Sequence, residues 1–272
     1  MCILDTRSSE EQGTVFFIHH DMHDVGIPLN VNDEDIFPGM LEPPRERPGA
    51  STMSFTRALC EISVSSVRMF KECSSGADAT SRQSVQRLSQ RLQQDYVDHW
   101  DLNEPIYILS TTVMRAIVAR LWLSIHHPIS RPTSLSNGNR NSLLRTAVEI
   151  IQLMISVFQN ETTWKWRWVV QPFTHCAAVA FVLAELCVRP ICPFTEDAWN
   201  SVLTLLELLH AVKRRKGMMW QPMWRLVDRA AAHRSKLKKE TQPATSSSCY
   251  ADQSFCLPIP LPGGGLLAHQ QQ

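Results

Sequence analysis

The sequence has little net charge and lacks the motifs of the common enzyme classes. Its 27 lysines and arginines nearly balance 26 acidic residues, which gives a formal charge of +1. Such a chain has no overall field that attracts nucleic acid or anionic lipid, so any such contact must be local. It contains no G-x-S-x-G, P-loop, G-x-G-x-x-G or H-E-x-x-H motif. We therefore predict no enzyme of a recognisable class, no catalytic residues and no cofactor.

Strand patterns, internal repeats and long apolar runs are also absent. No segment alternates apolar and polar residues over a useful length, and no unit of 20–50 residues recurs. The N-terminus lacks the basic stretch and apolar core of a secretory signal. The longest apolar run, Cys176 to Ala184, is far shorter than the ~20 residues that cross a bilayer. We predict an all-α intracellular protein with no membrane partner.

The eight cysteines are widely spread and show no C-x-x-C spacing. The pairs Cys187–Cys192 and Cys249–Cys256 have no second pair at zinc-finger distance. Most cysteines have apolar neighbours, as free buried thiols in a reducing compartment do. We expect no metal site and no disulfide framework here.

Two polar clusters between residues 19 and 35 suggest metal binding at first sight. Imidazole and carboxylate groups gather at His19, His20, Asp21 and His23, but the surrounding prolines disfavour the helix that would bring His19 and His23 together. The acidic run 33–35 lacks the alternating ligands and closing glutamate of a calcium loop. We predict a solvated loop for the first cluster and a turn and helix-capping role for the second.

Apolar residues recur with helical spacing through most of the chain. A long proline-rich loop is predicted for 14–51, and a disordered tail rich in Ser, Pro and Gly for 241–272. The predicted helices cover Cys2–Gln12, Thr52–Glu72, Arg82–Trp100, Glu104–His127, Leu143–Phe158, a segment from Thr195 to a basic run at 213–216, and Met218–Lys239. The predicted architecture is one large multi-helix domain over 1–240, followed by the tail.

The segment Thr162–Pro190 combines three tryptophans with the most apolar part of the chain. Trp164, Trp166 and Trp168 alternate with basic residues, and from Phe173 onward nearly every position is apolar. We predict that this segment is the central helix, with 173–188 buried. The tryptophans are interpreted as core or docking anchors, although the alternating cations leave room for one exposed face with cation–π contacts.

The run Lys213, Arg214, Arg215 and Lys216 is the strongest local concentration of positive charge. Short basic runs of this kind serve nuclear import or phosphate contacts. Cations are also favoured at the C-terminal end of a helix by the macrodipole, so a plain solvated face is the alternative. Both interpretations stay open.

Four ordered blocks resemble a known family. They read CILDTRSSEEQGT, IPLNVNDEDIFPGM, ERPGASTMSF and WRWVVQPFTHCAAVAFVLAELCVRP. Together they resemble the fungal-specific regulatory domain, or middle homology region, of zinc-cluster transcription factors, over roughly residues 2–232. The resemblance implies an all-helical regulatory domain that is cut at its N-terminal side.

The resemblance also carries functional expectations. In that family a module with six cysteines holds two zinc ions and places a helix in the DNA major groove; this sequence has no such array. We therefore expect a nuclear, or cytoplasmic, regulator or co-regulator of a fungal metabolic or secondary-metabolite pathway. It would act through protein contacts, with other regulators or a second copy as partner, and without sequence-specific DNA binding of its own. A small-molecule-sensing helical domain, which a small-molecule effector would control, is the alternative. A further alternative is an uncharacterised enzyme that uses His19, His23 or Cys187.

Overall fold

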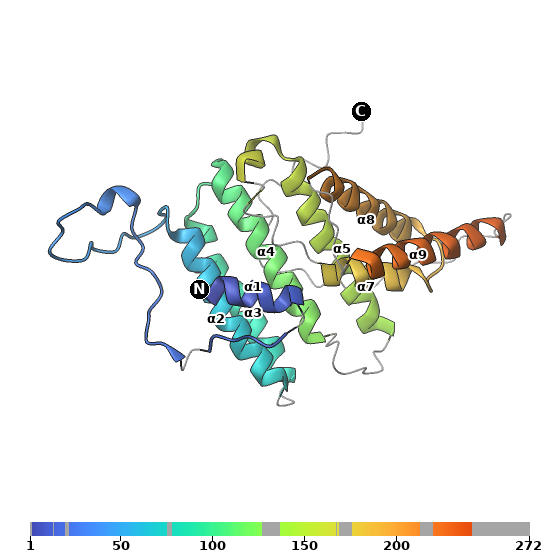
Figure 1. Ribbon diagram of the computed structural model, residues 1–272, viewed down its shortest axis with the longest axis horizontal. Helices are drawn as coiled ribbons and strands as arrows, with labels where there is room; N and C mark the ends of the chain where they lie inside the picture. Colours follow the sequence, from blue (N-terminus) through green and yellow to red (C-terminus); the bar gives the residue numbers. More distant parts are fainter. Residues whose placement is uncertain are drawn as a thin grey trace. The chain divides into compact units, whose positions relative to one another are not determined.

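The computed structural model describes most of the chain, and the regular structure in that part is helical (Figure 1). The described residues are 2–12, 14–19, 22–74, 78–126, 137–166, 168, 176–212 and 220–240. The predicted all-α fold class is confirmed. The predicted tail, 241–272, lies outside the described residues.

The helices fall into two units, one within Met1–Pro128 and the other within Ile129–Cys256. The first contains α1 (Cys2–Gln12), the short 3-10 helix η2 (Asp33–Asp35), α2 (Ser54–Ser74), α3 (Asp78–Asp95), η3 (Val97–His99) and α4 (Pro105–His126). The second contains α5 (Asn137–Gln159), η4 (Glu161–Trp166), α7 (Cys176–Leu186), α8 (Pro193–Val212) and α9 (Trp220–Glu240). A single domain over 1–240 stays a prediction.

In the first unit α2 is the helix around which the others pack. It contacts α1, α3 and α4, and α3 also contacts α4. The apolar face of α2 buries Leu59, Ile62 and Met69, as its spacing predicts. The matching face of α3 buries Val85 and Leu92. These predicted core faces are confirmed.

The helix α4 is buried along almost its whole length. It begins at Pro105, whose missing N–H is tolerated in a first turn, and ends at His126. By length and composition α4 and α5 could each cross a membrane, but 89% of the apolar window of α4 is buried inside the protein. An all-round apolar helix of this kind is what the centre of a globular fold requires.

In the second unit α7 is central, because it contacts α5, α8 and α9. Its side chains Val179, Val182 and Leu183 are buried. The predicted central helix is much longer than the observed one, which begins only at Cys176. Val188, predicted to be buried, is 63% exposed. Residues 173–175 lie outside the part of the chain that the structure describes.

The first part of the tryptophan-rich segment is the 3-10 helix η4, Glu161–Trp166. Asn160 ends α5, and its side-chain oxygen accepts bonds from the Thr162 N–H and hydroxyl at 2.9 and 2.7 Å. Such local bonds compete with helix continuation. Trp164 is 65% exposed and Trp168 72%. Of the interpretations that the sequence left open, a core position does not apply to these two side chains, and an exposed face does.

The C-terminal end of α7 carries a buried carboxylate held by two arginines. Glu185 accepts bonds from Arg140 Nη2 at 2.5 Å and from Arg189 Nε at 2.7 Å. Arg189 also donates to the Asn141 side chain at 2.7 Å. Because Arg140 and Asn141 belong to α5, the carboxylate ties the start of α5 to the end of α7. This pairing makes the burial of a charge tolerable.

From the sequence, Thr195 is predicted to cap the helix α8, because its hydroxyl can accept an N–H of the first turn. The helix begins at Pro193, so Thr195 is its third residue and not its cap. Its hydroxyl accepts the Cys192 N–H at 2.9 Å and lies 3.1 Å from the Pro190 carbonyl oxygen, to which it can donate. The next residue, Glu196, pairs with Arg234 of α9 at 2.6 Å. This turn therefore fixes both the start of α8 and the position of α9 against it.

Replacing Thr195 with valine is expected to lower the free energy of unfolding by about 1–2 kcal/mol. The substitution keeps the side-chain shape but leaves the buried Cys192 N–H without its acceptor. Urea denaturation followed by circular dichroism measures the change. Thr204→Val, at a half-buried position later in α8, is the matched control and should change stability by less than about 0.5 kcal/mol. Equal losses for the two variants would contradict the role of the Thr195 hydroxyl as the acceptor for the Cys192 N–H.

Candidate functional site

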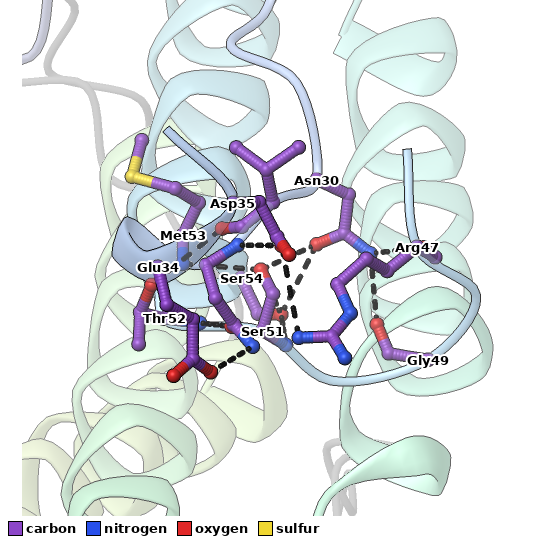
Figure 2. A network of polar contacts seen from close by, with 11 residues as sticks. Asn30, Glu34, Asp35, Arg47, Gly49, Ser51, Thr52, Met53 and Ser54 are labelled. Atoms are coloured by element: carbon purple, nitrogen blue, oxygen red, sulfur yellow. Dashed lines mark hydrogen bonds and ion pairs between the residues drawn. The ribbon is translucent and has the colours of Figure 1, made fainter. Parts of the chain in front are cut away.

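The best-organised polar feature of the first unit is a network centred on Asn30, which lies in the segment before α2 (Figure 2). The Asn30 side-chain amide donates to the carbonyl oxygens of Arg47 at 2.7 Å and Gly49 at 2.9 Å. Its oxygen accepts the Ser51 hydroxyl at 2.7 Å. The Arg47 N–H returns a bond to the Asn30 carbonyl oxygen at 2.8 Å. One asparagine thus holds together two stretches about 20 residues apart.

Two residues later, Asn32 repeats the arrangement. Its side-chain oxygen accepts the Thr52 N–H at 2.9 Å, and its own N–H donates to the Asp35 carboxylate at 2.8 Å. Asp35 in turn lies 3.6 Å from the Arg47 guanidinium. Asn and Asp favour such local bonds to backbone groups. The predicted turn and capping role of the acidic run is confirmed for Asp35.

The network ends at the first turn of α2. Ser51 N–H donates to the Ser54 hydroxyl at 2.8 Å, and the Ser51 hydroxyl accepts the Met53 N–H at 3.1 Å. Both serines are buried, as is Val31 beside them. The helix start and the Asn30 segment therefore form one ordered element, in which buried polar groups are paired as burial requires.

Glu46 and Arg57 attach the segment to α2. The Glu46 carboxylate accepts the Asn30 N–H at 2.9 Å and pairs with Arg57 Nη1 at 2.7 Å. The same Arg57 atom also donates to the Pro28 carbonyl oxygen. The backbone bond from Asn30, followed by the Arg57 charge, holds the pKa of Glu46 below its usual range, although desolvation opposes this. Glu46 is thus ionised when the segment is in place.

Acidification is expected to loosen this attachment. A carboxyl group with a lowered pKa in the folded state stabilises that state above its unfolded pKa, and the contribution disappears as the pH falls through the folded value. The Asn30 amide chemical shift in a ¹⁵N-labelled sample should therefore titrate with a midpoint below that of an ordinary glutamate. In Glu46→Gln the same amide should not titrate. A midpoint at or above the ordinary glutamate value would contradict the pairing.

A hollow of about 230 Å³ lies beside the network and is lined by polar residues. The lining residues are Asn30, Gly49, Ser54, Arg57, Glu61, Asp95, Tyr96 and His99. The Tyr96 hydroxyl donates to Glu61 at 2.8 Å, and Arg91 Nε lies 3.4 Å from the same carboxylate. Burial first, and the bond to Glu61 second, raise the pKa of Tyr96 above its usual range. Tyr96 therefore stays a hydrogen-bond donor at physiological pH.

Among the residues singled out from the sequence, those that the structure describes do not form a common metal or catalytic cluster. Lys213, Arg214, Arg215 and Lys216 lie outside the described residues, so their role stays a prediction. His23 Nε2 lies 3.6 Å from Cys2 Sγ. Burial raises the pKa of the half-buried Cys187 thiol, which lowers its nucleophilic fraction.

Within the described ranges, no three His, Cys, Asp or Glu side chains are placed to hold a metal ion. His20, Asp21, Cys249 and Cys256 fall outside those ranges. The metal question is therefore answered only for the described part of the chain.

Sequence reasoning located the right blocks but missed the contacts that join them. The blocks at 27–40 and 46–55 carry part of the family resemblance and fall largely within the predicted loop 14–51, yet nothing in either block shows that Asn30 reaches the carbonyl of Gly49. The pairing of Glu46 with Arg57 was also missed. Abundant Asn, Asp and Ser beside a helix start is the signal that could have predicted such a network.

Comparison with known proteins finds a transcription factor to which the chain is similar. No protein-family model matches it, and no solved structure matches it. It is similar to the aurofusarin cluster transcription factor aurR2 of Gibberella zeae, with 24% identity over 212 residues. The match covers 74% of this chain and 31% of that protein. The chain thus spans about a third of the length of its curated relative, and along most of its own length it is similar to part of a fungal transcription factor.

Proposed function

We propose that this chain is a transcriptional regulator or co-regulator of a fungal metabolic or secondary-metabolite pathway. The observation that carries the proposal is the similarity to a cluster transcription factor over 74% of the chain. The all-helical fold is compatible with the regulatory domain that the sequence blocks resemble. In this proposal the chain is not an enzyme and works in the nucleus, through contacts with other proteins.

The order of the segment before α2 supports action through protein contacts. Irregular segments of this length that keep a fixed conformation commonly have a role. The Asn30 network fixes the segment against α2 through side-chain bonds rather than through a buried core. Several large apolar side chains along it are exposed, among them Phe17, Phe37 and Leu41. A surface of this kind is suited to a partner.

Deleting the gene in the fungus that carries it tests the regulatory role. We expect the transcript levels of a contiguous set of genes to change by at least about tenfold, which equals a free-energy difference of about 1.4 kcal/mol. Re-expression of the full chain should restore the transcripts. Re-expression of Asn30→Asp, with the network broken, should restore them only in part. If no contiguous gene set responded to the deletion, the proposal would be abandoned.

Nuclear import through the basic run has its own test. A fluorescent fusion of the full chain should accumulate in nuclei, and changing Lys213, Arg214, Arg215 and Lys216 to glutamine should release it to the cytoplasm. Arg82→Gln with Arg87→Gln is the control, because both arginines are exposed on α3. If the nuclear signal were unchanged after loss of the basic run, the run would be a plain solvated face with no role in import.

A second candidate function is the sensing of a small polar molecule. The observation in its favour is the hollow of about 230 Å³ beside the Asn30 network. Ligand pockets usually enclose ~300–1,000 Å³ and are largely apolar, so this hollow would suit only a small polar metabolite. Thermal shift of the full chain against such metabolites tests the idea. A genuine ligand should raise the melting temperature of the wild type and not of His99→Ala, and a uniformly null panel would count against sensing.

A further inference from the structure

We propose that the stretch from Asp33 to Glu42, here called the acidic tip, docks against a basic amphipathic helix of a partner protein. Its first three residues and its last are acidic, and the stretch contains no lysine or arginine. Between the acids, Ile36 is 58%, Phe37 60% and Leu41 100% exposed. Single exposed apolar residues are ordinary, but three within six positions framed by like charges form a composite surface.

The acidic tip is held in one conformation. The Ile36 N–H donates to the Asp33 carbonyl oxygen at 3.2 Å, and the Met40 N–H to that of Phe37 at 3.4 Å. Gly39 has φ +89°, a value that favours glycine and closes the turn between Phe37 and Leu41. Asp35 joins the acidic tip to the Asn30 network through Asn32. A preordered loop loses less conformational entropy on binding, so its exposed side chains can contribute more of their contact energy.

The sign of the charge selects the class of partner. Four carboxylates, one of which (Asp35) pairs with Arg47 at 3.6 Å, leave the acidic tip negative, and a negative surface repels nucleic acid phosphates and anionic lipid headgroups. Three exposed apolar side chains among them make a purely ionic partner equally unsuitable. A helix with apolar residues at i, i+3 or i+4, and i+7, bordered by Lys and Arg, complements both features. Phe37 can also receive a cationic side chain on its ring face.

The inference deepens the proposed function, because it names the chemistry of the protein contact. It rests on the proposed function only where it assumes that the partner has a regulatory role. The binding itself does not depend on transcription. A failed binding test would therefore leave the gene-deletion result intact. A failed deletion test would leave the binding result intact.

Binding of a labelled peptide to the purified full chain tests the inference. The probe is a synthetic Leu/Lys amphipathic helix of ~18 residues, long enough to form several turns, measured by fluorescence anisotropy. We expect Asp33→Lys with Glu42→Lys to weaken binding by at least about tenfold. In this variant the charges of the stretch sum to zero, so it should no longer prefer the Leu/Lys peptide over the matching Leu/Glu peptide. Phe37→Ser with Leu41→Ser should weaken binding of the Leu/Lys peptide to the otherwise unchanged chain.

Controls separate the acidic tip from general charge attraction. Glu207→Lys, at an exposed position on α8, should leave binding unchanged. A scrambled peptide of the same composition should bind the wild type at least about tenfold more weakly. Equal binding of the scrambled peptide, or binding insensitive to the charge reversal, would overturn the inference. A salt-sensitive dimer of the chain alone that dissociates on charge reversal would overturn it in favour of a second copy as occupant.

Discussion

Replacing Glu185 with glutamine is expected to lower the free energy of unfolding by about 3–5 kcal/mol, the cost of removing one partner from a buried ion pair. Only 3% of Glu185 is exposed, and its two oxygens take bonds from Arg140 and Arg189. Glutamine keeps the volume but removes the negative charge, and its amide nitrogen is a donor that faces guanidinium donors. The Arg189 side chain, 12% exposed, then loses the carboxylate with which it pairs.

Two further variants define the origin of that loss. Arg140→Gln should cost less than Glu185→Gln, because the Arg140 side chain is 43% exposed and water can solvate the remaining partners. Glu185→Leu combined with Arg140→Leu and Arg189→Leu should recover much of the stability, since replacing a whole buried ionic group with apolar residues is often close to neutral. Urea denaturation monitored by circular dichroism gives each value. A loss below about 1 kcal/mol for Glu185→Gln would show that the carboxylate is not held as described.

The helices that the sequence predicts well are those with a single strong periodicity and clear ends. The segment 104–127 was predicted as a buried helix, and α4 covers Pro105–His126. Proline at its start and a second proline after its end mark both limits locally. Local signals of this kind need no knowledge of the rest of the fold. The same reason explains the agreement of α2 and α9 with their predicted ranges to within about two residues.

The errors arise where the outcome depends on contacts distant in sequence. An apolar run around Glu185 predicts burial but says nothing about Arg140, which is 45 positions earlier. The tryptophans alternate with cations in a way that fits either a buried or an exposed face. Their exposure follows from the Asn160 turn, which diverts the chain out of α5. Likewise the turn residues near Asn30 predict irregular structure, and only the folded chain shows which carbonyl groups they bind.

Asn30→Ala is expected to speed hydrogen exchange in the segment 28–53 by about 30-fold, which corresponds to about 2 kcal/mol of lost local stability. The alanine removes two donors to the Arg47 and Gly49 carbonyl groups and one acceptor for Ser51. Asn30 is only half-buried, so water can replace part of these bonds. The effect should therefore be opening of the segment and not unfolding of the unit.

Asn30→Asp should open the segment further than Asn30→Ala and raise the exchange rate by at least about 100-fold over the wild type. A carboxylate oxygen would then face the two carbonyl oxygens to which the Asn30 amide donates in the wild type. Exchange followed by mass spectrometry on the full chain resolves peptides from 28–53. Asn103→Ala is the matched control. The Asn103 side-chain amide donates to the Asp101 carboxylate at 2.8 Å, a local bond outside the segment 28–53. If Asn30→Ala and Asn30→Asp exchanged alike, or no faster than Asn103→Ala, the side-chain amide would not be what orders the segment. Reduced peptide binding by the opened variants would in addition connect the order of the Asn30 network to the acidic tip that it supports.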